Sequence, residues 1–145
     1  MKPSESNNIG MDRVLEAVDK FSAANAGLLD KIDIVAGISR GGLVPAALLA
    51  ARINKPLVAV YIDKSDKIYF DRPDWISGKN ILVVDDIIRS GKTLWLVKKH
   101  LGKNLFPASI SFFTLFKVLP LVQKEFLISS FSREIDCDVV FPWDC

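Results

Sequence analysis

The feature that most constrains the fold is an unbroken apolar run, residues 81–84, which ends at two adjacent aspartates, Asp85 and Asp86. A continuous run of this kind is typical of a strand that is buried on both faces of a sheet. A loop that contains Gly91 follows, and apolar residues at helical spacing begin shortly after Lys92. The succession of strand, loop and helix predicts one unit of an α/β sheet, in which ligands bind at the carboxyl ends of the strands.

An earlier part of the chain predicts a second unit of the same kind. Residues 32–38 are rich in β-branched side chains, residues 43–53 are an apolar stretch of helix formers, and residues 57–62 are again rich in strand formers. A strand, a helix and a strand in succession favour parallel pairing through a right-handed crossover. The two units together predict an α/β fold with an open, mostly parallel, twisted sheet flanked by helices.

Three further elements complete the predicted fold. Apolar residues recur at helical spacing within residues 11–26, with Asn8 as the candidate cap and Gly27 as the stop. Residues 108–116 and residues 138–141 are predicted to be strands. A chain of 145 residues suits one compact domain with its own core, so all of it is assigned to a single domain, 1–145.

Composition and charge exclude several classes of protein. The formal net charge is +2, which is too small to predict a nucleic-acid or membrane surface. No apolar run approaches the roughly 20 residues of a membrane span, and the first ten residues lack the apolar core of a secretory signal. The two cysteines, Cys137 and Cys145, and the single histidine, His100, form no zinc-binding pattern. We therefore expect a cytoplasmic protein that binds neither nucleic acid nor membranes.

The loop between the two aspartates and the predicted helix is suited to holding a phosphate group. Backbone N–H groups at the start of a helix form an anion site. Gly91 allows the backbone to approach the anion closely, and Ser90 and Thr93 add hydroxyl donors. Residues 89–93 are therefore predicted to bind a phosphate.

Two alternatives compete with this interpretation of the loop. A Walker A loop ends in a similar Ser-Gly-Lys-Thr sequence, but it requires a glycine five residues before Gly91, where this chain has Asp86. The second alternative is a structural strand–turn–helix corner with an acidic cap. A phosphorylated sugar explains the two acids better, because carboxylates accept hydrogen bonds from vicinal hydroxyls and Mg²⁺ can bridge hydroxyl and phosphate oxygens.

Residues 83–93 resemble the signature of type I phosphoribosyltransferases, which is an apolar strand, two acids, a few residues and then Ser/Thr-Gly-x-Thr. Residues 38–50 resemble the pyrophosphate loop of the bacterial xanthine-guanine members, in which the peptide before Arg40 can be cis. Arg40 offers a fork of donors that suits phosphate oxygens, and Gly41 and Gly42 permit a tight backbone. The resemblance implies transfer of 5-phosphoribose from phosphoribosyl pyrophosphate to a nitrogen of a base, with a purine as the expected base, and release of pyrophosphate.

The resemblance also implies roles for individual residues. Asp85 and Asp86 would hold the ribose hydroxyls directly or through the cofactor Mg²⁺, and Arg40 would stabilise the departing pyrophosphate, so these three are the candidate catalytic residues. The candidate metal ligands are Asp85, Asp86 and Asp144. The candidate substrate-binding residues are Ser39, Gly41, Gly42, Arg89, Ser90, Gly91, Lys92, Thr93, Lys117 and Trp143.

Two regions are expected to cover the substrates. Residues 117–145 would form a small C-terminal hood, in which Lys117 contacts the purine oxygen and Trp143 stacks on the ring; the alternatives are a surface lysine and a core or edge aromatic. Residues 63–80, which are polar and interrupted by proline and glycine, would form a mobile lid, with an ordinary mobile loop as the alternative. Family members often form oligomers, so a homodimer or homotetramer is expected.

One position departs from the pattern of the 6-oxopurine enzymes. Those enzymes carry an aspartate three residues after the second acid, as the candidate general base at the purine N7, and this chain has Arg89 there. The pKa of an arginine side chain stays above about 12, so it cannot act as a base. Arg89 motivates a second hypothesis, a non-catalytic sensor of a nucleotide or of phosphoribosyl pyrophosphate. A third is a hydrolase or transferase that acts on another phosphorylated sugar.

Overall fold

The chain folds around one mostly parallel sheet, which confirms the predicted α/β class. A computed structural model describes residues 8–118, 131–135 and 139–144. Within these residues the sheet has six strands in the order β3-β2-β1-β4-β5-β6, and only β2 and β3 are antiparallel. The strands are β1 (Ile34–Ile38), β2 (Leu57–Ile62), β3 (Ile68–Phe70), β4 (Asn80–Ile88), β5 (Ser109–Val118) and β6 (Phe131–Ile135).

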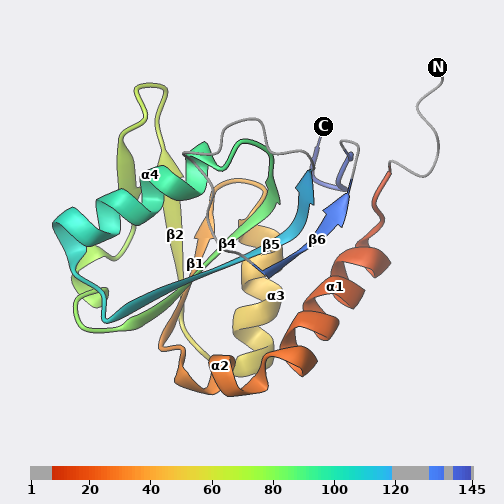
Figure 1. Cartoon of the computed structure of the whole chain (residues 1–145), viewed down its shortest axis with the longest axis horizontal. Helices are drawn as coiled ribbons and strands as arrows, with labels where there is room; N and C mark the ends of the chain where they lie inside the picture. The colour runs from red at the N-terminus through yellow and green to blue at the C-terminus, as the bar shows by residue number, and fades with distance from the viewer. Residues whose placement is uncertain (1–7, 119–130, 136–138, 145) are drawn as a thin grey trace.

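Helices cover both faces of the sheet (Figure 1). Helices α1 (Met11–Ala24) and α3 (Leu43–Ile53) lie on one face, and α4 (Lys92–His100) lies on the other. A short helix, α2 (Ala26–Lys31), leads into β1, and a π-helical turn, Leu101–Leu105, follows α4. The result is a three-layer sandwich, as expected for a parallel sheet that must be buried on both faces.

The side chains of β4 divide between the two cores. Leu82 and Val84 belong to the cluster under α1 and α3, whereas Ile81 and Val83 belong to the cluster under α4. All four are completely buried. This division follows from the alternation of side chains along a strand, and it explains why residues 81–84 are apolar without a break.

The first helix ends earlier than predicted. α1 stops at Ala24, where the backbone and side-chain amides of Asn25 both donate to the carbonyl of Phe21. Gly27 therefore does not stop the helix, and it lies inside α2. Asn8 does not cap α1 either, because it forms an isolated parallel bridge with Val140.

Other parts of the fold also differ from the prediction. β4 continues to Ile88 because β5 pairs with it beyond residue 84, and β5 itself extends to Val118. The predicted lid, residues 63–80, contains the edge strand β3 and a 3₁₀ turn, Pro73–Trp75. The strand β6 was not predicted. Of the predicted last strand, 138–141, residue 138 lies outside the described residues, and Val140 makes a single bridge to Asn8.

The strand order reverses between β1 and β4, the two central strands. From β1 the chain crosses to β2 on one side, whereas β4 is followed by β5 on the other side. Gly37 pairs with Val84, so the loop after β1 emerges beside Asp85. The crevice at such a reversal is the usual place for a ligand in an open α/β sheet. Within the described residues, no helix is long and apolar enough to cross a bilayer.

Candidate active site

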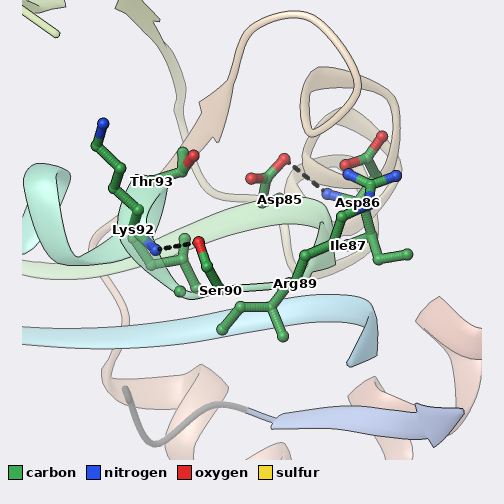
Figure 2. A pocket seen from close by; sticks show the side chains of 10 residues that line it. Asp85, Asp86, Ile87, Arg89, Ser90, Lys92 and Thr93 are labelled. Carbon is green, nitrogen blue, oxygen red and sulfur yellow. Dashed lines mark hydrogen bonds between the residues drawn. The ribbon is translucent and has the colours of Figure 1, made fainter. Parts of the chain in front are cut away.

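A pocket of about 280 Å³ lies at the end of β4 and is lined by residues 85–94 (Figure 2). This volume is at the small end of ligand pockets, so the part of the site lined by residues 85–94 suits a phosphorylated sugar fragment. Gly91 precedes the first residue of α4 with φ 85°, a left-handed conformation that favours glycine. The backbone N–H of Lys92 donates to the Ser90 hydroxyl at 3.2 Å, which orders the loop at the start of the helix.

The loop after β1 packs tightly against the end of β4. A Cβ atom on Gly42 would lie 2.5 Å from the carbonyl oxygen of Val84 and 2.8 Å from the Cα of Asp85. The peptide bond between Ser39 and Arg40 is cis, and both side chains are exposed. The two loops that the sequence predicted to bind phosphate groups, one before α3 and one before α4, therefore meet at the same edge of the sheet.

Asp85 has an unusual electrostatic environment. Burial is the main cause that raises the pKa of Asp85 well above the ordinary 3.8, and the neighbouring charge of Asp86 raises it further. The backbone N–H of Asp86, which donates to Asp85 Oδ1 at 2.8 Å, and the positive charge of Arg89 act in the opposite direction. A carboxyl group that burial holds toward its neutral form is a frequent feature of functional sites.

Asp86 points toward the other face of the sheet and meets the C-terminal segment. Its Oδ2 accepts a hydrogen bond from Trp143 Nε1 at 3.0 Å. A Cβ atom on Gly41 would overlap this carboxylate. Residues from β4, from the loop before α3 and from the C-terminal segment thus converge on one carboxylate, a contact that sequence spacing could not reveal.

Two other predicted residues at the base side have different positions. Lys117, near the end of β5, pairs in register with Ile88 of β4, the residue that precedes Arg89. Asp144 closes a turn, because its Oδ2 accepts from the backbone N–H of Phe141 at 2.9 Å. Within the part of the chain that the structure describes, no group of three or more acidic, histidine or cysteine side chains is placed to hold a metal. The assignment of Asp144 as a metal ligand stays a prediction.

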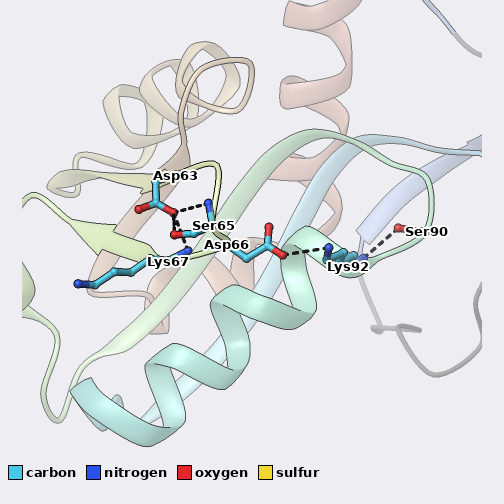
Figure 3. A network of polar contacts seen from close by, with 6 residues as sticks. All are labelled: Asp63, Ser65, Asp66, Lys67, Ser90 and Lys92. Atoms are coloured by element: carbon cyan, nitrogen blue, oxygen red, sulfur yellow. Dashed lines mark hydrogen bonds and ion pairs between the residues drawn. The ribbon is translucent and has the colours of Figure 1, made fainter.

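The β2–β3 hairpin makes a contact with the site that the sequence did not predict (Figure 3). Asp66 Oδ2 lies 3.0 Å from Lys92 Nζ, in an ion pair with both side chains half exposed. At the tip of the hairpin, Asp63 Oδ1 accepts hydrogen bonds from the backbone N–H and the hydroxyl of Ser65 and from the backbone N–H of Lys67. The hydrogen bond from the Ser65 hydroxyl is the main cause that lowers the pKa of Asp63. Only the folded hairpin brings Asp66 to α4, so no local pattern signals this pair.

The arrangement of Asp85 and Asp86 fits magnesium that arrives with a substrate. Mg²⁺ is usually held by one or two carboxylates together with substrate phosphates and water. Asp85 and Asp86 supply two carboxylates beside the phosphate-type loop. The chemistry of this donor set therefore suits a metal shared with a phosphorylated ligand rather than an enclosed protein site.

Comparisons with known proteins agree with the geometry. The family model described as "Phosphoribosyl transferase domain" matches residues 11–144. A xanthine-guanine phosphoribosyltransferase from Cereibacter sphaeroides is 31% identical over 122 residues, which cover 76% of this chain and 68% of that protein. The enzyme of the same name from Desulfotalea psychrophila is 31% identical over 136 residues, which cover 81% of this chain and 74% of that protein.

Solved structures are similar over most of the chain. A purine phosphoribosyltransferase from Pyrococcus horikoshii has a TM-score of 0.77 at 23% identity, with 95% of each chain covered. A hypoxanthine-guanine phosphoribosyltransferase from Bacillus anthracis has a TM-score of 0.71 at 26% identity, with 86% of this chain and 78% of that chain covered. The first of these shows a shared fold, and the second is similar in both fold and sequence.

Proposed function

Because this chain belongs to the phosphoribosyltransferase family, whose members are enzymes, we propose that it transfers 5-phosphoribose from phosphoribosyl pyrophosphate to a purine base. The bond between the ribose anomeric carbon and pyrophosphate breaks, and pyrophosphate leaves with the electron pair. A bond forms from that carbon to a ring nitrogen of the base, which gives up its proton to solvent. The observation that carries the proposal is the convergence of the Gly41–Gly42 loop and the pocket of residues 85–94 on the two aspartates.

In this proposal, each part of the substrate is bound by a different set of site residues. Residues 89–93 anchor the 5-phosphate through backbone N–H groups and hydroxyls at the start of α4. Asp85 and Asp86 hold the ribose hydroxyls, and Arg40, with Ser39, Gly41 and Gly42, faces the departing pyrophosphate. When bound, Mg²⁺ would be held by Asp85 and Asp86 and would neutralise charge on the pyrophosphate. The main contributions of the protein are positioning and charge stabilisation.

Two residues bear on which purine is the acceptor. Lys117 has three donors and no acceptor, so a contact with position 6 of the ring favours an oxo group over an amino group. Arg89 occupies the place of the acidic base found in the 6-oxopurine enzymes, and an arginine cannot accept the proton. The similarity to xanthine-guanine enzymes supports a 6-oxopurine. Because Arg89 departs from the pattern of the 6-oxopurine enzymes, adenine is also tested as an acceptor.

The direct test is pyrophosphate release and nucleotide formation with Mg²⁺, phosphoribosyl pyrophosphate and a panel of guanine, xanthine, hypoxanthine, adenine and pyrimidines. The proposal predicts release with at least one purine, and its loss in the double variant Asp85→Asn/Asp86→Asn. Release with a pyrimidine alone would refute the choice of a purine. Binding of phosphoribosyl pyrophosphate or a nucleotide without any release would favour the sensor hypothesis instead.

Three further proposals concern the context of the enzyme. A net charge of +2 supports the absence of a nucleic-acid or membrane partner, and a cysteine content of two supports a reducing compartment such as the cytoplasm. We also propose a homodimer or homotetramer, which light scattering of the purified protein can test.

Replacing Asp66 with asparagine is expected to lower the KM for phosphoribosyl pyrophosphate by about twofold to fivefold, which corresponds to the free energy of an exposed ion pair. The change frees Lys92 for the phosphate and removes a negative charge near the anion. Glu16→Gln is the matched control, since it also removes an exposed carboxylate that is paired with a lysine, within α1. A KM that rises in Asp66→Asn would mean that the ion pair helps to hold the loop for binding.

A further inference from the structure

Trp143 contacts the second aspartate of the site with the only hydrogen-bonding group of its side chain. The indole N–H donates to Asp86 Oδ2 at 3.0 Å, across a separation of 57 residues in sequence. The indole N–H is a donor only, so this bond holds one oxygen of the Asp86 carboxylate in place while the carboxylate keeps acceptor sites for a ligand. Asp86 is thus oriented by a residue outside its own loop.

The opposite side of the Asp86 carboxylate is closed by the loop after β1. A Cβ atom on Gly41 would overlap Asp86 Oδ2 and would lie 3.0 Å from Trp143 Nε1. The carboxylate therefore lies between a backbone that permits only glycine and a fixed indole. This confinement leaves the carboxylate few orientations, which is what a group that must meet two ribose hydroxyls requires.

Trp143 is itself held by a stack of aromatic rings. Its ring stacks on Phe141 with centroids 4.8 Å apart and an interplanar angle of 8°. Phe141 is 3% exposed and meets Phe116 of β5 at 5.9 Å. One face of the indole is therefore taken by Phe141, and the indole is anchored through it to the strand beside β4.

The backbone of the C-terminal segment is fastened as well. The backbone N–H of Phe141 donates to Asp144 Oδ2 at 2.9 Å, and the backbone N–H of Asp144 donates to the carbonyl oxygen of Phe141 at 3.0 Å. These two bonds close a turn that contains Trp143. Ile9 N–H donates to the carbonyl of Val140 at 2.8 Å. These bonds give the indole a defined position before any ligand binds.

We propose that Trp143 is a positioning residue, which fixes the Asp86 carboxylate for the ribose through its indole N–H. The inference rests on the proposed function, because it takes Asp86 as a ribose-binding acid. It goes beyond the stacking role expected from the sequence, since a stacking ring needs no N–H group. The base side and the ribose side of the site are then linked through one side chain.

The first test observes the contact without any substrate. In a ¹H–¹⁵N spectrum of the ¹⁵N-labelled protein, the indole resonance of Trp143 is the one that disappears in Trp143→Phe. Replacing Asp86 with alanine should shift this resonance upfield in the proton dimension, while the resonances of Trp75 and Trp95 keep their positions. An unmoved Trp143 resonance would overturn the proposal.

The second test separates positioning from stacking. Trp143→Phe keeps a ring that can stack but removes the N–H group, so kcat should fall by about tenfold to a hundredfold, the effect expected for a hydrogen bond to a charged group. The KM for the base should change by less than about twofold. Trp95→Phe, on α4 and outside the residues that line the pocket, is the matched control and should keep both constants.

The outcomes distinguish this inference from the proposed function. A wild-type kcat in Trp143→Phe would overturn the positioning role, as would a loss confined to the KM for the base. If the wild-type protein forms no nucleotide but the Asp86→Ala shift is present, the contact is supported and the proposed function is wrong.

Discussion

Replacing Gly42 with alanine is expected to lower the free energy of unfolding by about 2 kcal/mol or more and to reduce turnover by roughly a hundredfold. Gly42 has φ −71°, which alanine adopts easily, so the cost is steric. The added Cβ would meet Val84 O at 2.5 Å, and Asp85 Cα and Ile38 O at 2.8 Å. All three neighbours are backbone atoms of central strands, so either β4 or the loop must move. Urea unfolding and pyrophosphate release measure the two effects.

Gly27→Ala is the control for that substitution. Gly27 lies in α2, and a Cβ atom there would have no neighbour within 4 Å. Alanine is favoured over glycine in helices by up to about 1 kcal/mol, so stability should stay the same or rise, and activity should not change. A Gly42→Ala protein with the stability and turnover of the wild type would contradict the tight contact between the two loops.

Replacing Asp85 with asparagine is expected to have opposite effects on activity and stability. Activity should fall by roughly a hundredfold, because a group that stabilises charge or hydroxyls in the transition state is lost. Stability at neutral pH should rise by about 1 kcal/mol, as is common when a functional group that is unfavourable for folding is removed. The asparagine oxygen can still accept the Asp86 N–H bond that Asp85 Oδ1 accepts, so the local structure should survive.

The sign of the pH dependence follows from the raised pKa of Asp85. The unfolded chain loses the proton near the ordinary value of 3.8, while burial keeps the proton on the folded protein to higher pH. Between these two pKa values the folded state binds more protons, so stability falls as pH rises through this window and then levels off. Urea unfolding without Mg²⁺ should show this fall in the wild type and a smaller one in Asp85→Asn.

A matched substitution at an exposed acid tests whether the effect belongs to Asp85. Asp74→Asn changes the net charge equally at an exposed position, and it should retain the fall in stability of the wild type. If Asp85→Asn is less stable than the wild type at neutral pH, the carboxyl group contributes to the fold in a way that burial does not explain.

The sequence predicted the centre of the fold well because its signals are local. Residues 81–84 face two cores at once, which requires an unbroken apolar run. The glycines before α3 predicted a close backbone approach, and Gly42 makes one. In each case the signal in the sequence is carried by a short local run of residues, even where the contact that it predicts is made with a distant strand.

The features that the sequence did not predict depend on distant pairing. β4 extends through Asp85 and Asp86 because β5 lies beside it, and no property of the two acids alone indicates a strand. The ion pair of Asp66 with Lys92 requires the β2–β3 hairpin to fold toward α4. The role of Asp144 in a turn, and the bond from Trp143 to Asp86, likewise appear only when the C-terminal segment is placed.

The measurement that tests the central claim most directly is calorimetric titration of the protein with phosphoribosyl pyrophosphate, with and without Mg²⁺. The account predicts one site per chain and tighter binding with Mg²⁺. The affinity should be at least about tenfold weaker in Asp85→Asn/Asp86→Asn, because this variant loses charge-assisted hydrogen bonds to the ligand. Failure of the wild-type protein to bind, or equal binding by the double variant, would contradict the assignment of the crevice between β1 and β4 as the phosphoribosyl site.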